Sequence, residues 1–314
     1  MTAHTAKVWF ITGASSGFGR EWAEASLDRG DRVVATARSV DRLDDLVERH
    51  GDAVLVQRLD VTDRAGVGAA IARALERFGR LDVVVNNAGF GHVGMVEELA
   101  EGEIRAALET NVLGTLWVTQ AVLPVLRAQG GGHILQVTSE GGIIAFPEFG
   151  AYHAAKWAVE GLSQSLRLEV ADFGIHVTCV EPGPYATNFA GGGLGRSEHL
   201  AAYDGVRDRI DRSGWTLGDP VATRAAILDI VDAENPPSRI VLGRALDGIE
   251  RDYAERLRIW RAWQETSLAA FGAAGPCREP DLTANRYSQA GSRSRVVRSR
   301  EASRSNWGPV FGSS

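Results

Sequence analysis

Three residues have side chains whose types and spacing suit proton transfer to or from a substrate oxygen: Ser139, Tyr152 and Lys156. Tyr152 and Lys156 are four apart in a helical pattern, so both side chains lie on one face. A free tyrosine has a pKa near ~10, but a neighbouring ammonium favours the phenolate. Lowering that pKa to about 7 corresponds to roughly 4 kcal/mol. Ser139 adds a hydroxyl able to hold a substrate carbonyl.

The pair of Tyr152 and Lys156 is weak support by itself, because a tyrosine and a lysine one turn apart occur on many surface helices. Composition strengthens the interpretation. Lys7 and Lys156 are the only lysines among the 34 basic residues, so chance alone rarely places a lysine here. Ser139 stands where an apolar run ends, which brings a third polar group to the same place.

Two units of a strand followed by a helix are expected to position these groups. Residues 133–138 form an apolar run typical of a buried parallel strand, and residues 151–174 form a helical pattern that stops at Gly174. Nearer the N-terminus, the apolar run 7–12 leads into a glycine-rich turn and another helical pattern. This order predicts a pyrophosphate site, because glycines let the backbone approach and a helix start offers N–H groups.

Together these motifs resemble the short-chain dehydrogenase/reductase family. The spacing of Ser139, Tyr152 and Lys156 is similar to its catalytic set. Residues 12–19 read TGxxxGxG rather than the GxGxxG of longer-chain dehydrogenases, an apolar strand ends in NNAG at 86–89, and residues 182–187 read PGxxxT. The resemblance covers roughly residues 7–245, with the motifs in the family's order.

The resemblance implies four catalytic residues. Ser139 would hydrogen-bond the substrate oxygen, and Tyr152 would act as general acid and base. Lys156 would hold the cofactor ribose and favour the phenolate, while the carbonyl of Asn111 would bind a water that relays protons to the lysine.

A set of cofactor-binding residues also follows from the resemblance. Asp60 and Val61 match the family's adenine-contacting turn, and Thr187 is expected beside the nicotinamide carboxamide. Asp63 is expected to cap the helix that follows that turn. The implied set is Gly13, Ser15, Ser16, Gly17, Phe18, Gly19, Arg38, Asp60, Val61, Asn87, Ala88, Gly89, Tyr152, Lys156, Pro182, Gly183 and Thr187.

The end of the second strand favours NADP(H) over NAD(H), although NAD(H) remains possible. Sites that prefer NAD place an acidic side chain there for the ribose hydroxyls, and this chain has Ala37. Arg38 follows, and a guanidinium can pair with a 2′-phosphate. Thr36 and Ser39 are expected to add hydroxyl donors nearby.

Strand and helix patterns alternate seven times, which predicts an α/β fold: a doubly wound, Rossmann-type parallel sheet of about seven strands with helices on both faces. The resemblance implies the strand order 3-2-1-4-5-6-7. It also implies a homodimer or homotetramer built on two long helices, at 101–127 and 151–172.

Residues 1–275 are expected to form a single oxidoreductase domain, in which the glycine-rich stretch 184–218 has little periodicity and is interpreted as a substrate lid. Between 247 and 271, Ile249, Tyr253, Leu257, Trp260 and Trp263 recur at helical spacing, a stripe interpreted as core or subunit packing. Residues 276–314 are rich in arginine and serine and are expected to be disordered.

Composition and charge limit the classes of partner, metal site and cellular location that are expected. The 314 residues are 44% apolar and carry a net charge of −6, of which residues 276–314 hold +4 and residues 1–275 hold −10. An acidic body argues against a nucleic-acid partner. Two cysteines give neither a disulfide framework nor a metal cluster. With no apolar run of about 20 residues and no room for a signal peptide, neither a membrane span nor export is expected, and the protein is predicted to be cytoplasmic.

The predicted function is reversible hydride transfer between a nicotinamide cofactor and a small-molecule secondary alcohol or ketone. Two alternatives remain open: a catalytically silent regulator that senses nucleotides with the same fold, and a sugar-nucleotide epimerase or dehydratase. Glu140 and His92 depart from the family's usual pattern and are candidates to line the substrate pocket. The substrate itself is left open.

Overall fold

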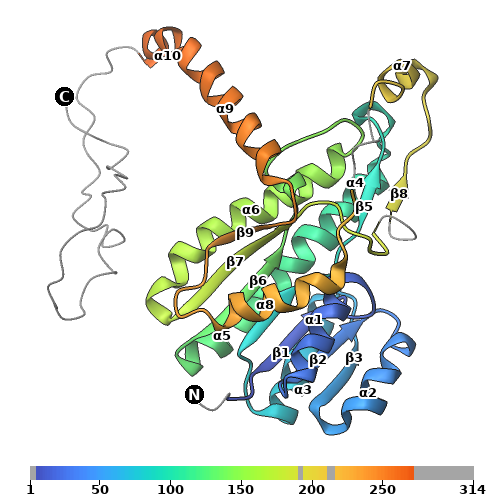
Figure 1. Ribbon diagram of the computed structural model, residues 1–314, viewed down its shortest axis with the longest axis vertical. Coiled ribbons are helices and arrows are strands. Elements are labelled where there is room, and N and C mark those ends of the chain that lie inside the picture. Colours follow the sequence, from blue (N-terminus) through green and yellow to red (C-terminus); the bar gives the residue numbers. More distant parts are fainter. Residues whose placement is uncertain (1–4, 190–193, 211–215, 272–314) are drawn as a thin grey trace, which may run out of the picture. The chain divides into compact units, whose positions relative to one another are not determined.

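The computed structural model of the chain describes residues 5–189, 194–210 and 216–271 (Figure 1). One compact unit spans Met1–Gly275. The predicted disorder of residues 276–314 lies outside the described residues.

Seven parallel strands form the central sheet, in the order β3-β2-β1-β4-β6-β7-β9 (Figure 1). Counted along this sheet alone, that order is 3-2-1-4-5-6-7, so the predicted fold class and strand order are both confirmed. The strands are β1 (Val8–Thr12), β2 (Arg32–Ala37), β3 (Val54–Arg58), β4 (Val83–Asn86), β6 (Gly132–Val137), β7 (Ile175–Pro182) and β9 (Arg239–Leu242).

Helices cover both faces of the sheet. Alternate side chains of a strand point to opposite faces, so Trp9 and Ile11 of β1 join one core cluster while Val8 and Phe10 join another. The helices in the first cluster are α1 (Gly17–Asp28), α2 (Asp44–His50) and α8 (Thr223–Asp232). Those in the second are α3 (Arg64–Phe78), α5 (Thr115–Gln129) and α6 (Gly150–Val170).

The described part of the stretch interpreted as a substrate lid contains short elements, among them β8 (Leu194–Arg196), a 3-10 turn (Ala201–Tyr203) and α7 (Asp204–Arg207). Strand β8 pairs in parallel with β5 (Gly91–Val93) in a small second sheet (Figure 1). Strands of three residues are too short to show a periodic pattern, so the sequence gives no signal for them. This pairing ties the segment after β7 to the segment after the NNAG motif.

The long helix expected at 101–127 is interrupted in the structure. An α-helix, α4 (Glu101–Leu108), passes into a π-helical stretch at Glu109–Gly114 and then into α5. Asn111 lies in the π-helical stretch and is 1% exposed. Such single-turn π-bulges occur frequently at functional sites.

Two consecutive helices, α9 (Leu246–Ala262) and α10 (Gln264–Phe271), end the described chain. Of the apolar stripe interpreted as core or subunit packing, only Ile249 is buried, and Trp260 and Trp263 are 65% and 66% exposed. The stripe is therefore not part of this chain's own core. None of the described helices combines the length and apolar character needed to cross a membrane.

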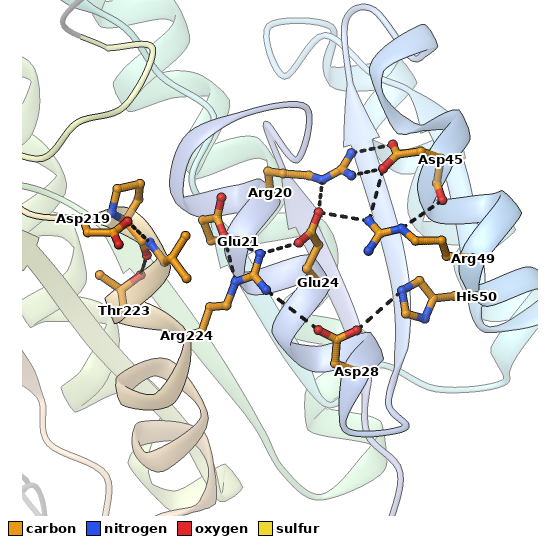
Figure 2. A network of polar contacts seen from close by, with 12 residues as sticks. Arg20, Glu21, Glu24, Asp28, Asp45, Arg49, His50, Asp219, Thr223 and Arg224 are labelled. Carbon is orange, nitrogen blue, oxygen red and sulfur yellow. Dashed lines mark hydrogen bonds and ion pairs between the residues drawn. The ribbon is translucent and has the colours of Figure 1, made fainter.

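An ion-pair network joins α1 to α2 and α8 on the surface (Figure 2). Arg20 of α1 binds Glu24 and Asp45, and Arg224 of α8 binds Glu21 and Glu24. The Arg20 guanidinium holds the pKa of the Asp45 carboxyl at about 2. Single exposed ion pairs contribute little, but a network of shared carboxylates restricts the helices more. It fixes α1, whose first turn follows the glycine-rich loop.

Candidate active site

Ser139 follows β6 and begins a short 3-10 turn at Glu140–Gly142. Its Oγ accepts a hydrogen bond from the Gly141 N–H (3.1 Å) and donates to the Pro182 carbonyl (3.4 Å). These bonds orient the hydroxyl at the carboxyl ends of β6 and β7, where ligands bind in doubly wound sheets.

Tyr152 of α6 is 9% exposed, and the Ser139 hydroxyl is close enough to influence its pKa. Burial raises the pKa of Tyr152 to about 12, an effect that the Ser139 hydrogen bond opposes and the Glu140 charge increases. The expectation that this tyrosine is a phenolate near neutral pH is therefore wrong for the protein by itself. Burial is the largest influence on the pKa of Tyr152, and the Lys156 Nζ lies 5.8 Å from the ring centre.

Lys156 and Asn111 meet around Gly89. The Lys156 Nζ donates to the Val137 carbonyl (2.8 Å), and burial lowers the pKa of Lys156 to about 8. The side-chain amide of Asn111 accepts a hydrogen bond from the Phe90 N–H and donates one to the Phe90 carbonyl, at 3.0 Å each. A Cβ at Gly89 would lie 2.7 Å from Asn111 Oδ1 and 3.7 Å from Lys156 Nζ. The structure thus brings the four predicted catalytic residues to one buried edge of the sheet.

Two glycines of the loop between β1 and α1, Gly13 and Gly19, have little room for a side chain. Gly13 and Gly17 have positive φ values of 67° and 56°, a conformation that favours glycine. A Cβ at Gly19 would lie 2.5 Å from both the Gly13 carbonyl oxygen and Asn87 Nδ2. Asn87 in turn donates to the carbonyls of Thr12 and Gly13. This backbone cradle at a helix start suits a pyrophosphate group.

Arg38 is exposed just beyond β2, and its charge helps lower the pKa of Asp60, after the two hydrogen bonds from Thr62. The prediction that Thr36 offers a hydroxyl here is wrong, because its Oγ1 donates to the Ile11 carbonyl and the residue is 1% exposed. Asp63 caps α3 through the Gly66 N–H, as predicted.

Residues that follow β7 lie beside both the glycine-rich loop and Tyr152. A Cβ at Gly17 would lie 3.4 Å from Thr187 Cβ, so Thr187 lies beside the glycine-rich loop. Phe189 packs against Tyr152, with ring centres 5.2 Å apart. Sequence reasoning did not single out Phe189, since one aromatic residue in an aperiodic stretch carries no signal. It covers the phenol ring from the side of the segment predicted as a lid.

A buried acidic pair holds this segment in place through Arg207 of α7. The Arg207 guanidinium binds Glu98 and Glu148, whose side chains are 1% and 6% exposed. Glu98 also accepts hydrogen bonds from the Leu200 and Met95 N–H groups, and Arg207 holds the pKa of Glu98 at about 2. We call these three side chains, Glu98, Glu148 and Arg207, the lid clamp.

Glu148 has a positive φ of 70°, which costs a non-glycine residue about 1–3 kcal/mol. It lies two residues before the start of α6, so the lid clamp acts on the loop that leads to the catalytic helix. A cavity of about 540 Å³ opens beside Phe149, between this loop, β5 and β8. Phe149, which lines this cavity, also packs against Tyr152, with ring centres 6.4 Å apart.

His92 and Glu140, the two departures from the family pattern, have different surroundings. His92 is 5% exposed, and its Nε2 lies 2.8 Å from Ser197 Oγ, which donates to Glu103. His92 therefore joins β5 to β8 instead of standing free in a pocket. Glu140 lies nearer the reactive groups: its Oε2 is 3.6 Å from the Cβ position of Gly183, and burial raises its pKa.

Two further carboxyl groups are buried behind the catalytic lysine. Glu160 is one turn after Lys156 on α6, and Glu181 is on β7; they are 5% and 1% exposed. Both lie near Arg239, at 3.4 Å and 3.3 Å. Burial raises the pKa of Glu181 to about 7, and the neighbouring Glu160 carboxylate adds to the effect.

Replacing Glu181 with glutamine is expected to stabilise the fold more at about pH 8 than at about pH 5. The pKa of Glu181 is higher in the folded chain than its ordinary value, so the folded state loses stability as pH rises from about 4.5 to 7. The loss reaches roughly 3 kcal/mol. Melting temperatures of wild type and variant across this range measure it, with Glu169→Gln on the exposed face of α6 as control. An increment that does not change with pH would contradict the prediction.

Comparison with known proteins gives consistent matches. A family model described as short chain dehydrogenase matches residues 7–192. The oxidoreductase BOA17 of Botryotinia fuckeliana is 40% identical over 271 residues, which cover 84% of this chain and 99% of that protein. A solved short-chain dehydrogenase from Streptomyces avermitilis has a TM-score of 0.79 and 40% identity, with 86% of this chain and 100% of that chain covered.

Two further solved structures were obtained with nicotinamide cofactors or their derivatives. An alcohol dehydrogenase from Thermococcus sibiricus, complexed with 5-hydroxy-NADP, has a TM-score of 0.65 and 30% identity, covering 76% of this chain and 96% of that one. A 3-ketoacyl-(acyl-carrier-protein) reductase from Brucella melitensis, complexed with NADH, has a TM-score of 0.65 and 28% identity, covering 75% and 96%.

Proposed function

This chain belongs to the short-chain dehydrogenase family and is an oxidoreductase, and we propose that it catalyses reversible hydride transfer between a nicotinamide cofactor and a secondary alcohol or ketone. The observation that carries the proposal is the meeting of Ser139, Tyr152, Lys156 and Asn111 at the carboxyl edge of the sheet. A regulator that had lost its chemistry would have no need of this buried set.

The residues present fit a dinucleotide. The backbone cradle at Gly13, Gly17 and Gly19 would hold the pyrophosphate, and Arg38 with Asp60 would face the adenosine end. Gly89, Lys156 and Thr187 would lie along the nicotinamide half. When bound in its reduced form, the nicotinamide supplies the hydride; the protein supplies binding, orientation and charge.

In the reducing direction Tyr152 donates its phenolic proton to the carbonyl oxygen while Ser139 donates a hydrogen bond to that oxygen. Lys156 lies beside the phenol and stabilises the negative charge that the proton transfer leaves on Tyr152. Asn111, held by the backbone of Phe90, would keep a relay water near the lysine. Phe189 and Phe149 exclude bulk water from the phenol.

Tyr152 has its proton available for a general-acid step in the protein by itself. Because burial raises its pKa to about 12, the residue carries its proton throughout the neutral range. A general acid must be protonated to act, whereas oxidation requires the phenolate.

A carbonyl panel tests this function. Purified full-length protein with NADPH is expected to reduce at least one ketone from a set containing steroid, retinoid-like, polyketide and simple ketones, as followed by loss of reduced-nicotinamide absorbance. Binding of the nucleotide without turnover of any ketone would favour the nucleotide-sensing alternative, and turnover of a sugar nucleotide would favour an epimerase or dehydratase.

A preference for NADP(H) is expected to depend on Arg38. A charge-assisted contact of about 1.5–3 kcal/mol corresponds to a roughly ten- to hundredfold preference. The double variant Ala37→Asp/Arg38→Ala should reverse the ratio of kcat/KM for NADPH and NADH. Arg32→Ala, at the other end of the same strand, is the matched control and should leave the ratio unchanged. A wild-type enzyme that prefers NADH would overturn the preference without affecting the proposed reaction.

The remaining proposals concern the oligomeric state of the enzyme and the compartment in which it works. The resemblance points to a homo-oligomer that acts on a small molecule, and Cys179 is a buried free thiol, as a reducing compartment such as the cytoplasm would maintain.

A further inference from the structure

The helices α9 and α10 present large apolar side chains to solvent. At least two-fifths of each side chain is exposed, and the aromatic ones dominate. Besides Leu246 (52%) and Ile259 (44%), six of them are Tyr253 (45%), Leu257 (43%), Trp260 (65%), Trp263 (66%), Leu268 (65%) and Phe271 (83%). We call these six side chains the α9–α10 face. A contiguous apolar surface of this kind marks an interaction site.

Among the described residues, the polar and ring contacts of α9 with the rest of the unit come from its residues up to Arg256. Ile249 packs in a small cluster with Ile143 and Ala245, and Arg256 donates to the Ile143 carbonyl and stacks on Trp157. Among the described residues, no hydrogen bond, ion pair or ring contact joins 257–271 to any element other than α9 and α10. In Figure 1 α9 runs away from the helices that cover the sheet.

A helical segment of this length is marginal in water when nothing covers its apolar side. The exposed fractions correspond to roughly 700 Å² of apolar side-chain surface, close to the ~800 Å² that each partner contributes to a standard interface. The surface is therefore large enough to form a stable contact with a partner.

The charges on α9 indicate which partner fits. Glu250 and Arg261 are eleven residues apart, which places them about 20° apart around the helix, on the same flank of the apolar stripe. Within the described part of the chain neither takes part in an ion pair. An antiparallel copy of α9, related by a twofold axis between residues 255 and 256, would bring Glu250 of each copy opposite Arg261 of the other.

We propose that the α9–α10 face binds a second copy of this chain, with the two α9 helices antiparallel. A twofold contact uses the same surface on both subunits, and one helix here carries both halves of each Glu250–Arg261 pair. Tyr253 and Leu257 lie next to the twofold axis, so Tyr253 of one copy packs against Leu257 of the other. Trp260 of one copy packs beside the first half of α9 in the other.

Charge also distinguishes this partner from a lipid surface. Residues 246–271 contain five acidic side chains and four arginines, and residues 1–275 carry −10. Helices that lie on anionic membranes have an excess of basic residues on their polar face. The net negative charge of this surface therefore opposes membrane binding, whereas the paired flank charges suit self-association.

Charge reversal tests the contact in the full-length protein. Glu250→Arg and Arg261→Glu should each weaken dimerisation at least tenfold in sedimentation equilibrium, because each creates two like-charge pairs. The double variant should restore it to within about threefold of wild type, since the pairs re-form with reversed polarity. Arg251→Glu, on the opposite side of the helix from the stripe, is the matched control and should have no effect.

A cross-link makes the test independent of any other subunit contact. Leu257→Cys in a Cys277→Ser background should give a covalent dimer with a short bismaleimide reagent, and Glu250→Arg should abolish it; Cys179 is buried. No cross-link, or charge variants that all assemble like wild type, would overturn the proposal. So would binding to phosphatidylglycerol vesicles that Trp260→Glu abolishes, because a lipid surface would then be the partner.

Discussion

Replacing Tyr152 with phenylalanine is expected to lower kcat for ketone reduction by at least about a hundredfold, within the range attributed to a positioned general acid. The change removes one oxygen atom from a buried ring whose contacts with Phe149 and Phe189 are apolar. Fold and nucleotide affinity should therefore persist, with the melting temperature close to wild type and the dissociation constant within about threefold. Loss of the proton donor alone then accounts for the loss of rate.

Tyr185→Phe is the matched control for this variant. The Tyr185 ring packs edge-on against Phe18 at 5.0 Å, near the glycine-rich loop and outside the proposed proton-transfer set. Removal of the Tyr185 hydroxyl should leave kcat within about twofold of wild type. A Tyr152→Phe enzyme with even a tenth of wild-type kcat, a deficit of only about 1.4 kcal/mol, would exclude Tyr152 as the acid.

Gly19→Ala is expected to have the second largest effect, a loss of nucleotide affinity of at least about a hundredfold together with roughly 1–3 kcal/mol of stability. The added Cβ would lie 2.5 Å from a backbone oxygen, Gly13 O, and from Asn87 Nδ2. A backbone atom cannot rotate away as a side chain can, so the loop that cradles the pyrophosphate must shift. Titration with NADPH and chemical unfolding measure the two losses.

Gly68→Ala separates this steric effect from the general effect of a helical alanine. Gly68 is exposed in α3, and a Cβ there meets nothing within 4 Å. Because alanine is the better helix former, this control should gain about 0.5–1 kcal/mol. If Gly19→Ala bound NADPH like wild type, the loop would not be the pyrophosphate site.

Much of the fold was predictable because its signals are local. Each buried parallel strand is a short apolar run, and each helix has an apolar stripe, so the order of elements and the doubly wound class follow from pattern alone. The glycine-rich loop was equally predictable, because the positive φ of Gly13 and Gly17 favours glycine at these positions. The side-by-side placement of Ser139, Tyr152 and Lys156 follows from the strand and helix that carry them.

The parts that were not predictable depend on residues far apart in the chain or on burial. The lid clamp joins Arg207 to Glu98 and Glu148, and no spacing rule links such positions. The raised pKa of Tyr152 needs the degree of burial, which one sequence does not give. Thr36 was misjudged for the same reason: strand alternation did not reveal that its hydroxyl turns toward β1.

The π-helical stretch at Glu109–Gly114 makes this part of the chain more tolerant of substitution than of a change in length. A π turn holds about one residue more than an α turn, so deletion of a single residue would let the helix close into regular α geometry. Asn111 would then rotate by about 100°, away from the Phe90 backbone groups that now hold it. Among descendants of a common ancestor, insertions and deletions should therefore collect in the loops before α4 and after α5 and spare this turn.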